Sequence, residues 1–120
     1  MLIEMLQAKL HRASVTDCHI DYPGSLTVDE DLLDLVGIRV HQKIQVVNIN
    51  NGSRLETYTI PGRRGAAEII VNGAAARLAQ PGDRVIIIAY GHYDPAELDD
   101  HQPRVAVLDE RNHVIDRMGM

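Results

Sequence analysis

Arg84-Val85-Ile86-Ile87-Ile88-Ala89-Tyr90 is the most hydrophobic stretch of the chain, and its β-branched residues favour a strand that is buried on both faces. The first half of the chain contains a similar stretch, Lys43-Ile44-Gln45-Val46-Val47. In each half the sequence predicts a short helix and a turn just before this strand. Two similar halves favour a small closed β-barrel with pseudo-twofold symmetry, because closing the sheet removes its open edges.

The remaining segments complete a mainly β pattern with short helices. Asp29 is a suitable N-cap and Gly37 suits the position after a helix, so the leucine-rich segment between them is predicted to be helical. Asn51-Gly52 is a strong hairpin signal, since this pair accepts positive φ values. We expect strands over residues 2–20, 43–50, 54–60, 68–71, 84–90 and 105–108, helical turns over residues 29–37, 74–78 and 94–100, and a tail over residues 110–120.

Composition limits the classes of protein to which the chain can belong. Its 120 residues predict a single domain over residues 1–120, and a net charge of −5 disfavours binding to nucleic acid. A single cysteine, Cys18, allows no internal disulfide, and no apolar run has the length of a membrane span, so we expect a cytoplasmic protein. The absence of Phe and Trp predicts an aliphatic core. The histidines lack a spacing typical of metal ligands, so no metal site is predicted.

Tyr22-Pro23-Gly24-Ser25 is the candidate reactive site of the chain. A lone Gly-Ser bond is typical of a linker. It can also react with itself, because the serine hydroxyl lies next to the carbonyl of Gly24, which has no Cβ to block the approach and can take a strained conformation. Attack at that carbonyl gives an ester. β-Elimination then frees the carboxylate of residue 24 and leaves a dehydroalanine, which hydrolysis converts to a pyruvoyl group at position 25.

Four further motifs surround this serine: Lys9-Leu10-His11, Asn51-Gly52-Ser53-Arg54, Thr57-Tyr58 and Asn72-Gly73-Ala74-Ala75. Together with Gly24-Ser25 they resemble the aspartate 1-decarboxylase family over roughly the first ninety residues. The resemblance implies a closed, six-stranded double-psi β-barrel that cuts its own chain between Gly24 and Ser25. It also implies a covalent pyruvoyl cofactor derived from Ser25. This group forms a Schiff base with L-aspartate, and the reaction gives β-alanine and CO₂ for pantothenate and coenzyme A synthesis.

The same resemblance implies roles for individual residues. Ser25 and Tyr58 are the expected catalytic residues, with Tyr58 as proton donor, and Thr57 is expected to polarise the Gly24 carbonyl during self-cleavage. The residues implied for substrate binding are Lys9, His11, Arg54, Thr57, Asn72, Gly73, Ala74 and Ala75. A homotetramer with its sites between subunits is implied as well.

The chemistry of these side chains suits an acidic substrate. A bond from arginine to a carboxylate is worth roughly 1.5–3 kcal/mol, so Arg54 with Lys9 can hold a carboxylate against the net negative charge of the protein. On a strand, Lys9 and His11 share one face, whereas Thr57 and Tyr58 point to opposite faces. Two such neighbours can serve one reaction if the strand is irregular or the site lies between subunits, and we favour the second arrangement.

Two other functions remain open. The first is a small barrel that acts as a binding or assembly module and keeps the bond between Gly24 and Ser25 intact. The second is a pyruvoyl enzyme that acts on a different amino acid, since charge alone does not separate aspartate from glutamate. Asp21 and Pro23 also differ from the residues that are frequent in the family just before the cut, which bears on the rate of self-cleavage.

Overall fold

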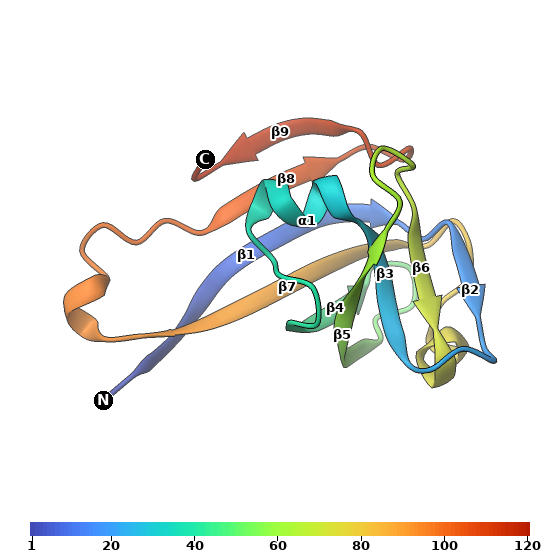
Figure 1. Cartoon of the computed structure of the whole chain (residues 1–120), viewed down its shortest axis with the longest axis horizontal. Coiled ribbons are helices and arrows are strands. Elements are labelled where there is room, and N and C mark those ends of the chain that lie inside the picture. The colour runs from blue at the N-terminus through green and yellow to red at the C-terminus, as the bar shows by residue number, and fades with distance from the viewer.

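The computed structural model describes residues 1–120 and is mainly β, as predicted. Its strands are β1 (Ile3–Ser14), β2 (Asp17–His19), β3 (Ser25–Asp29), β4 (Lys43–Asn48), β5 (Arg54–Gly62), β6 (Ile69–Asn72), β7 (Arg84–Tyr93), β8 (Arg104–Leu108) and β9 (Val114–Met118). One α-helix, α1 (Glu30–Val36), and two 3₁₀ helices, η1 (Gly73–Leu78) and η2 (Pro95–Glu97), lie between the strands (Figure 1). None of these helices combines the length and the apolar character that crossing a membrane requires.

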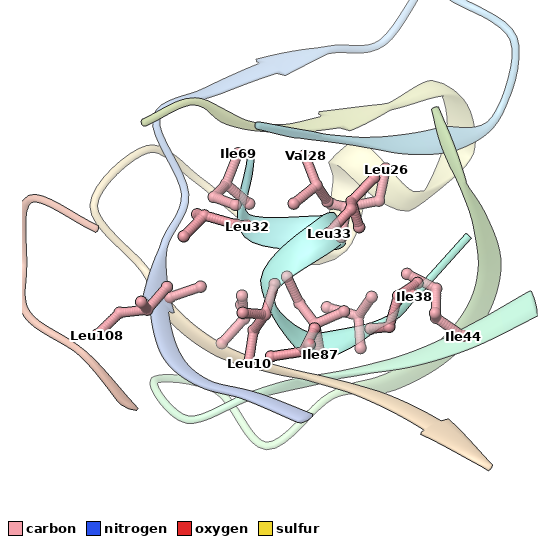
Figure 2. Packing of buried hydrophobic residues seen from close by; sticks show 14 of the residues in the cluster. Leu10, Leu26, Val28, Leu32, Leu33, Ile38, Ile44, Ile69, Ile87 and Leu108 are labelled. Atoms are coloured by element: carbon pink, nitrogen blue, oxygen red, sulfur yellow. The ribbon is translucent and has the colours of Figure 1, made fainter. Parts of the chain in front are cut away.

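All nine strands belong to one sheet, whose hydrogen-bonded order is β2-β6-β3-β5-β4-β7-β1-β8-β9. The strands β1 and β2 are neighbours in the chain, separated only by Val15 and Thr16. The N–H of Thr16 donates to the carbonyl of Ile69, so the chain passes directly from pairing with β7 to pairing with β6. The paired strands therefore wrap around a central core (Figure 2), and β8 and β9 extend the sheet beyond β1.

The internal repeat predicted from the sequence is visible in the strand pairing. The strands β4 and β7 pair antiparallel, and Val46 lies opposite Ile87, which is the residue at the same position of the other repeat. The strands β3 and β6 also pair antiparallel, whereas β3 with β5 and β2 with β6 pair parallel. Exchanging β4 with β7, β3 with β6, and β5 with the β1–β2 stretch leaves this order of pairing unchanged. The six-part arrangement therefore has pseudo-twofold symmetry.

The helix α1 begins and ends where its sequence predicts. The Asp29 carboxylate accepts a hydrogen bond from the N–H of Asp31, and Gly37 takes a left-handed conformation with a φ of 76° after the last turn. Leu32 and Leu33 are buried, and Figure 2 shows them among the core side chains. The helix therefore packs its apolar face on the core directly after the end of β3.

The core is aliphatic and continuous. Nineteen buried residues form one cluster, in which Leu10 of β1, Leu26 and Val28 of β3, Ile44 of β4 and Ile87 of β7 lie close together (Figure 2). Burial of each such side chain stabilises the fold by about 1.5–3 kcal/mol. Because β3 contributes two of these residues, the strand that begins at the candidate reactive serine is firmly anchored.

The structure differs from the predicted elements in the first third of the chain. The strand expected over residues 2–20 is divided into β1 and β2, and Arg12 has a positive φ of 65° where the pairing with β7 is irregular. The strand β3 was not among the predicted strands. Its hydrogen-bonding partners are β5 and β6, which lie far along the chain, so the local sequence contains little sign of it.

The tail expected over residues 110–120 is instead part of a hairpin, and that prediction was wrong. The strand β9 pairs antiparallel with β8, although its side chains remain largely exposed. Asn112, which is buried in the turn, donates through its amide nitrogen to the carbonyls of Ser14 and Ala67 and accepts from the N–H of Ser14. These bonds fasten the hairpin to distant segments, so no local pattern reveals them.

Candidate active site

Ser25 is buried at the start of β3, with 3% of its surface exposed. Tyr22, Pro23 and Gly24 precede it as an exposed bend, which we call the 22–24 loop. The Ser25 hydroxyl donates to the carbonyl of Pro23 at 3.3 Å. The aromatic ring of Tyr22 packs edge-on against His19, with ring centroids 5.0 Å apart. The buried Ser25 hydroxyl thus lies directly after the exposed 22–24 loop. The loop is held at one end by the contact of Tyr22 with His19 and at the other by the burial of Ser25.

Asn72, the last residue of β6, orients this hydroxyl. It lies opposite Ser25 in the strand pairing and is 1% exposed. Its Nδ2 donates to Ser25 Oγ at 3.1 Å and to Thr27 Oγ1 at 2.9 Å, while its Oδ1 is buried without a partner. An unpaired buried acceptor costs about 1–3 kcal/mol, so Oδ1 is ready to accept from a donor brought to this place. Sequence reasoning missed Thr27, because its role depends on β3.

Gly73 meets the 22–24 loop at very short range. It has a φ of +73°, and a Cβ at this position would lie 2.6 Å from the Cα and 2.7 Å from the nitrogen of Gly24. At Gly24 itself a Cβ would meet no atom within 4 Å, and its φ is not positive. At Gly24 a Cβ would thus be free of contacts with the segments around the loop, and whether it would hinder the adjacent Ser25 hydroxyl stays a prediction. The close approach belongs to Gly73.

A narrow, mostly apolar pocket adjoins Ser25. Thr57 of β5 and Ala75 of η1 line it together with Ser25, and so do Leu55 and Leu78. It has room for about one water molecule. The fold therefore brings three of the predicted site residues, Ser25, Thr57 and Ala75, around one small space, and Asn72 and Gly73 adjoin it through Ser25 and Gly24.

Arg54 and Tyr58 lie on the opposite, outer face of β5. The strand alternates, so that Arg54, Glu56 and Tyr58 are exposed while Thr57 points inward, as the period of a strand predicts. The Arg54 guanidinium makes one hydrogen bond, to Gln45 at 2.9 Å. Tyr58 is 39% exposed and lies in a shallow open hollow together with Glu56 and three other residues. Neither residue lines the pocket beside Ser25 of the same chain.

Lys9 belongs to this outer face as well. In the strand register Lys9 lies opposite Ile88, Ile88 opposite Gln45, and Gln45 opposite Glu56. Directly paired residues of antiparallel strands point to the same side, so these four side chains form a row across the outside of the sheet. Lys9 therefore shares its face with Arg54 and Tyr58, although β5 and β1 are three pairings apart.

His11 lies two residues further along β1, and its Nδ1 is buried without a hydrogen-bond partner. Burial, and then the positive charges of Lys9, Arg12 and Arg84, lower the pKa of His11 below its ordinary value. The shift favours the neutral ring, whose buried Nδ1 can accept a hydrogen bond. It does not line the pocket beside Ser25.

The other reactive side chains of the molecule have ordinary structural surroundings. Burial raises the pKa of the Cys18 thiol, and the negative charges of Asp17 and Asp83 raise it further, so the thiol is a poor nucleophile. Its sulfur donates to the carbonyl of Ala79. The structure contains no group of three or more His, Cys, Asp or Glu side chains placed to hold a metal ion.

Comparison with known proteins identifies relatives along nearly the whole chain. Residues 1–115 match the family model described as aspartate decarboxylase. A Bacillus cereus (strain B4264) protein named aspartate 1-decarboxylase is 53% identical over 119 residues, which cover 99% of this chain and 94% of the relative. Proteins of the same name from Bacillus velezensis and Salinibacter ruber are both 56% identical, over 96% and 95% of this chain and 91% and 78% of their own lengths.

Proposed function

The chain belongs to the aspartate decarboxylase family and is an enzyme that decarboxylates aspartate, and we propose that it does so with a pyruvoyl group made from its own Ser25. Loss of the α-carboxylate gives β-alanine, which serves pantothenate and coenzyme A synthesis. The observation that carries the proposal is the Ser25 hydroxyl, which is buried, held by Asn72 and adjacent to the peptide bond with Gly24.

The first stage is a reaction of the chain with itself. The Ser25 oxygen bonds to the carbonyl carbon of Gly24 while the carbon–nitrogen bond between the two residues breaks, so the amide becomes an ester and the nitrogen a free amine. Removal of the Ser25 α-proton expels the Gly24 carboxylate and leaves dehydroalanine. Water then replaces the nitrogen, which departs as ammonia, and residue 25 is left as a pyruvoyl group. Asn72 orients the hydroxyl, and we assign to Thr57 the polarisation of the Gly24 carbonyl.

The surroundings of position 25 fit a pyruvoyl group. The group is no larger than the serine it replaces and carries no charge, so it suits the mostly apolar pocket. Asn72 Nδ2, which donates to the Ser25 oxygen, can donate to a carbonyl oxygen in its place. The unpartnered Oδ1 of Asn72 can accept from the amine of an amino acid. Once formed, the group supplies an electron sink for the electrons that remain when CO₂ leaves.

We assign the binding of the substrate carboxylates to Arg54 and Lys9, assisted by His11. Each bond from a cationic side chain to a carboxylate is worth roughly 1.5–3 kcal/mol, which corresponds to about one to two decades in affinity. We assign a contact with the substrate to the backbone of Gly73, Ala74 and Ala75, since Ala75 lines the pocket beside Ser25 and Gly73 lies against Gly24. Tyr58 donates the proton that replaces the lost carboxylate.

These assignments require a neighbouring subunit. Arg54, Tyr58 and Lys9 lie on the outer face, whereas the Ser25 pocket is lined from the inside of the sheet. A second copy that presents its outer face to Ser25 brings both sets together, and we propose a homotetramer with its sites between subunits. We propose the cytoplasm as its compartment, because Cys18 is the one cysteine and no disulfide within the chain can form.

Isotope release from aspartate tests this function. The purified protein is incubated with aspartate labelled with ¹³C at the α-carboxylate, or separately at the side-chain carboxylate, and with labelled glutamate. We expect labelled CO₂ from the α-carboxylate of aspartate alone. A binding module releases none, and release from glutamate would support an enzyme for a different amino acid.

Substitution of the serine tests its chemical role. Ser25→Ala is expected to fold, remain one chain and release no CO₂. The matched control is Ser14→Ala on β1, which also removes a buried serine hydroxyl. Unlike the hydroxyl of Ser25, that of Ser14 has no hydrogen-bond partner. The control is expected to keep full activity. Retained activity in Ser25→Ala would exclude a pyruvoyl group made from this residue.

A further inference from the structure

We propose that Gly73 is a positioning residue for self-cleavage, because its lack of a side chain sets the place of the 22–24 loop relative to Ser25. The inference rests on the proposed function and concerns the making of the active site, before any substrate binds. It gives Gly73 a second role beside the contact with substrate assigned above.

The contact between Gly73 and the loop is a backbone contact. A Cβ at position 73 would lie 2.6 Å from Gly24 Cα, 2.7 Å from Gly24 N and 2.9 Å from the carbonyl oxygen of Tyr22. Non-bonded heavy atoms are normally about 3.5 Å or more apart. All three neighbours are main-chain atoms, so no side chain can rotate away to make room. Any residue other than glycine must move the loop, or the end of β6, by roughly an ångström.

The nucleophile and the electrophile of self-cleavage are both positioned by the end of β6. Asn72 holds the Ser25 oxygen through its side chain, and the next residue, Gly73, supports Gly24 through its backbone. Ser25 is further fixed by its pairing with Asn72 and by the anchoring of β3 in the core. A side chain at position 73 therefore changes the position of Gly24 relative to Ser25, whichever of the two segments moves.

Such a displacement acts directly on the reacting atoms. An intramolecular attack requires the oxygen and the carbonyl carbon to lie about 3–3.5 Å apart in the right direction, and a misplacement of about 1 Å costs about 100-fold in rate. We therefore expect a side chain at position 73 to slow self-cleavage by about 100-fold. A methyl group at Gly24 would meet open space, whereas one at Gly73 would clash with the loop. A steric clash between the loop and the end of β6 is therefore expected from a substitution of Gly73 and not of Gly24.

The test measures how fast newly made chains cleave. The full chain is synthesised in a cell-free system with a short pulse of label, and the decay of the uncut species is followed on gels and by intact mass. Gly73→Ala is compared with Gly65→Ala, whose φ of +78° is similarly unfavourable but whose Cβ would meet no atom within 4 Å. The control is expected to cleave within a few-fold of the unaltered chain, and Gly73→Ala about 100-fold more slowly.

Two further measurements separate positioning from a general loss of structure. Hydroxylamine cuts esters, so it detects chains in which the oxygen of Ser25 has already attacked, and Gly73→Ala is expected to contain no such chains. Gly73→Asn introduces the same Cβ, and asparagine tolerates a positive φ better than alanine does. If Gly73→Ala does not fold, this variant shows whether a Cβ at position 73 slows self-cleavage. We expect slow cleavage in this variant too.

The results distinguish the role of Gly73 from the self-cleavage on which it depends. Cleavage of folded Gly73→Ala or Gly73→Asn at the rate of Gly65→Ala would overturn the role of Gly73 and leave the proposed function intact. An ester that accumulates in the Gly73 variants would also overturn it, because attack would then precede the block. Failure of the unaltered chain to cleave would overturn the proposed function, and this inference with it.

Discussion

Replacement of Asn72 by leucine removes the group that orients the reactive hydroxyl while nearly preserving the volume of the side chain. The variant loses the donations to Ser25 Oγ and Thr27 Oγ1 and also loses the buried Oδ1 that has no partner. We expect Asn72→Leu to fold and to cleave itself slowly.

The effect on stability follows from two opposing contributions. Two neutral hydrogen bonds contribute about 1–3 kcal/mol in total, and removal of an unpaired buried acceptor recovers about 1–3 kcal/mol. The free energy of unfolding should therefore change by no more than about 2 kcal/mol. The rate of self-cleavage has no such compensation, because the Ser25 hydroxyl loses its orientation, and we expect it to fall about 100-fold.

Urea denaturation measures the first quantity and intact mass over time the second. Both use a matched control, Thr27→Val, which removes the second acceptor of Asn72 and leaves the bond to Ser25. The control is expected to cleave at a nearly normal rate. Normal cleavage by folded Asn72→Leu would refute the claim that Asn72 orients Ser25. A decrease of more than about 3 kcal/mol in the free energy of unfolding would show that removing the unpaired acceptor does not offset the two lost hydrogen bonds.

Four other variants test the proton donor, the substrate carboxylate site, the anchor of the C-terminal hairpin and the pH dependence of stability. Tyr58→Phe should still cleave itself but release β-alanine slowly in a turnover assay, and normal turnover would remove Tyr58 as proton donor. Arg54→Gln should raise the KM for aspartate by about 10–100-fold, with normal self-cleavage by mass, and an unchanged KM would exclude it from substrate binding. Asn112→Ala should lower the unfolding free energy by about 2–3 kcal/mol in urea, since it breaks three hydrogen bonds of which two are buried, and an unchanged midpoint would show that the hairpin needs no such anchor. The pKa of His11 is lower in the folded chain than in the unfolded chain, so the unfolded chain binds the His11 proton first as the pH falls below about 6.5, and acidification lowers the free energy of unfolding. His11→Gln should therefore lose less stability than the unaltered chain between pH 7 and pH 5, as measured by urea midpoints, and an equal loss in both proteins would exclude His11 as the cause.

Elements whose signals are local could be predicted from the sequence. The helix α1 is bounded by Asp29 and Gly37, and both act through atoms of the adjacent turn. The opposite orientations of Thr57 and Tyr58 follow from the period of a strand, and the pseudo-twofold repeat was visible in two similar hydrophobic stretches. Each of these features depends on residues close together in the chain.

The features that could not be predicted depend on distant partners. The strand β3 forms through pairing with β5 and β6, and the hairpin of β8 and β9 is fastened by Asn112 to Ser14. The close approach at Gly73 arises because the 22–24 loop crosses the end of β6, which no motif around either glycine indicates. The resemblance to a known family thus named the residues of the candidate site, whereas the contacts among them required the fold.

The intact mass of the purified protein shows whether the chain cuts itself between Gly24 and Ser25. We expect two species: residues 1–24, which end in a free carboxylate, and residues 25–120, which are lighter by one ammonia than a fragment that begins with serine. A single full-length chain that persists after prolonged warming would contradict self-cleavage at Gly24–Ser25, and with it the origin of the pyruvoyl group.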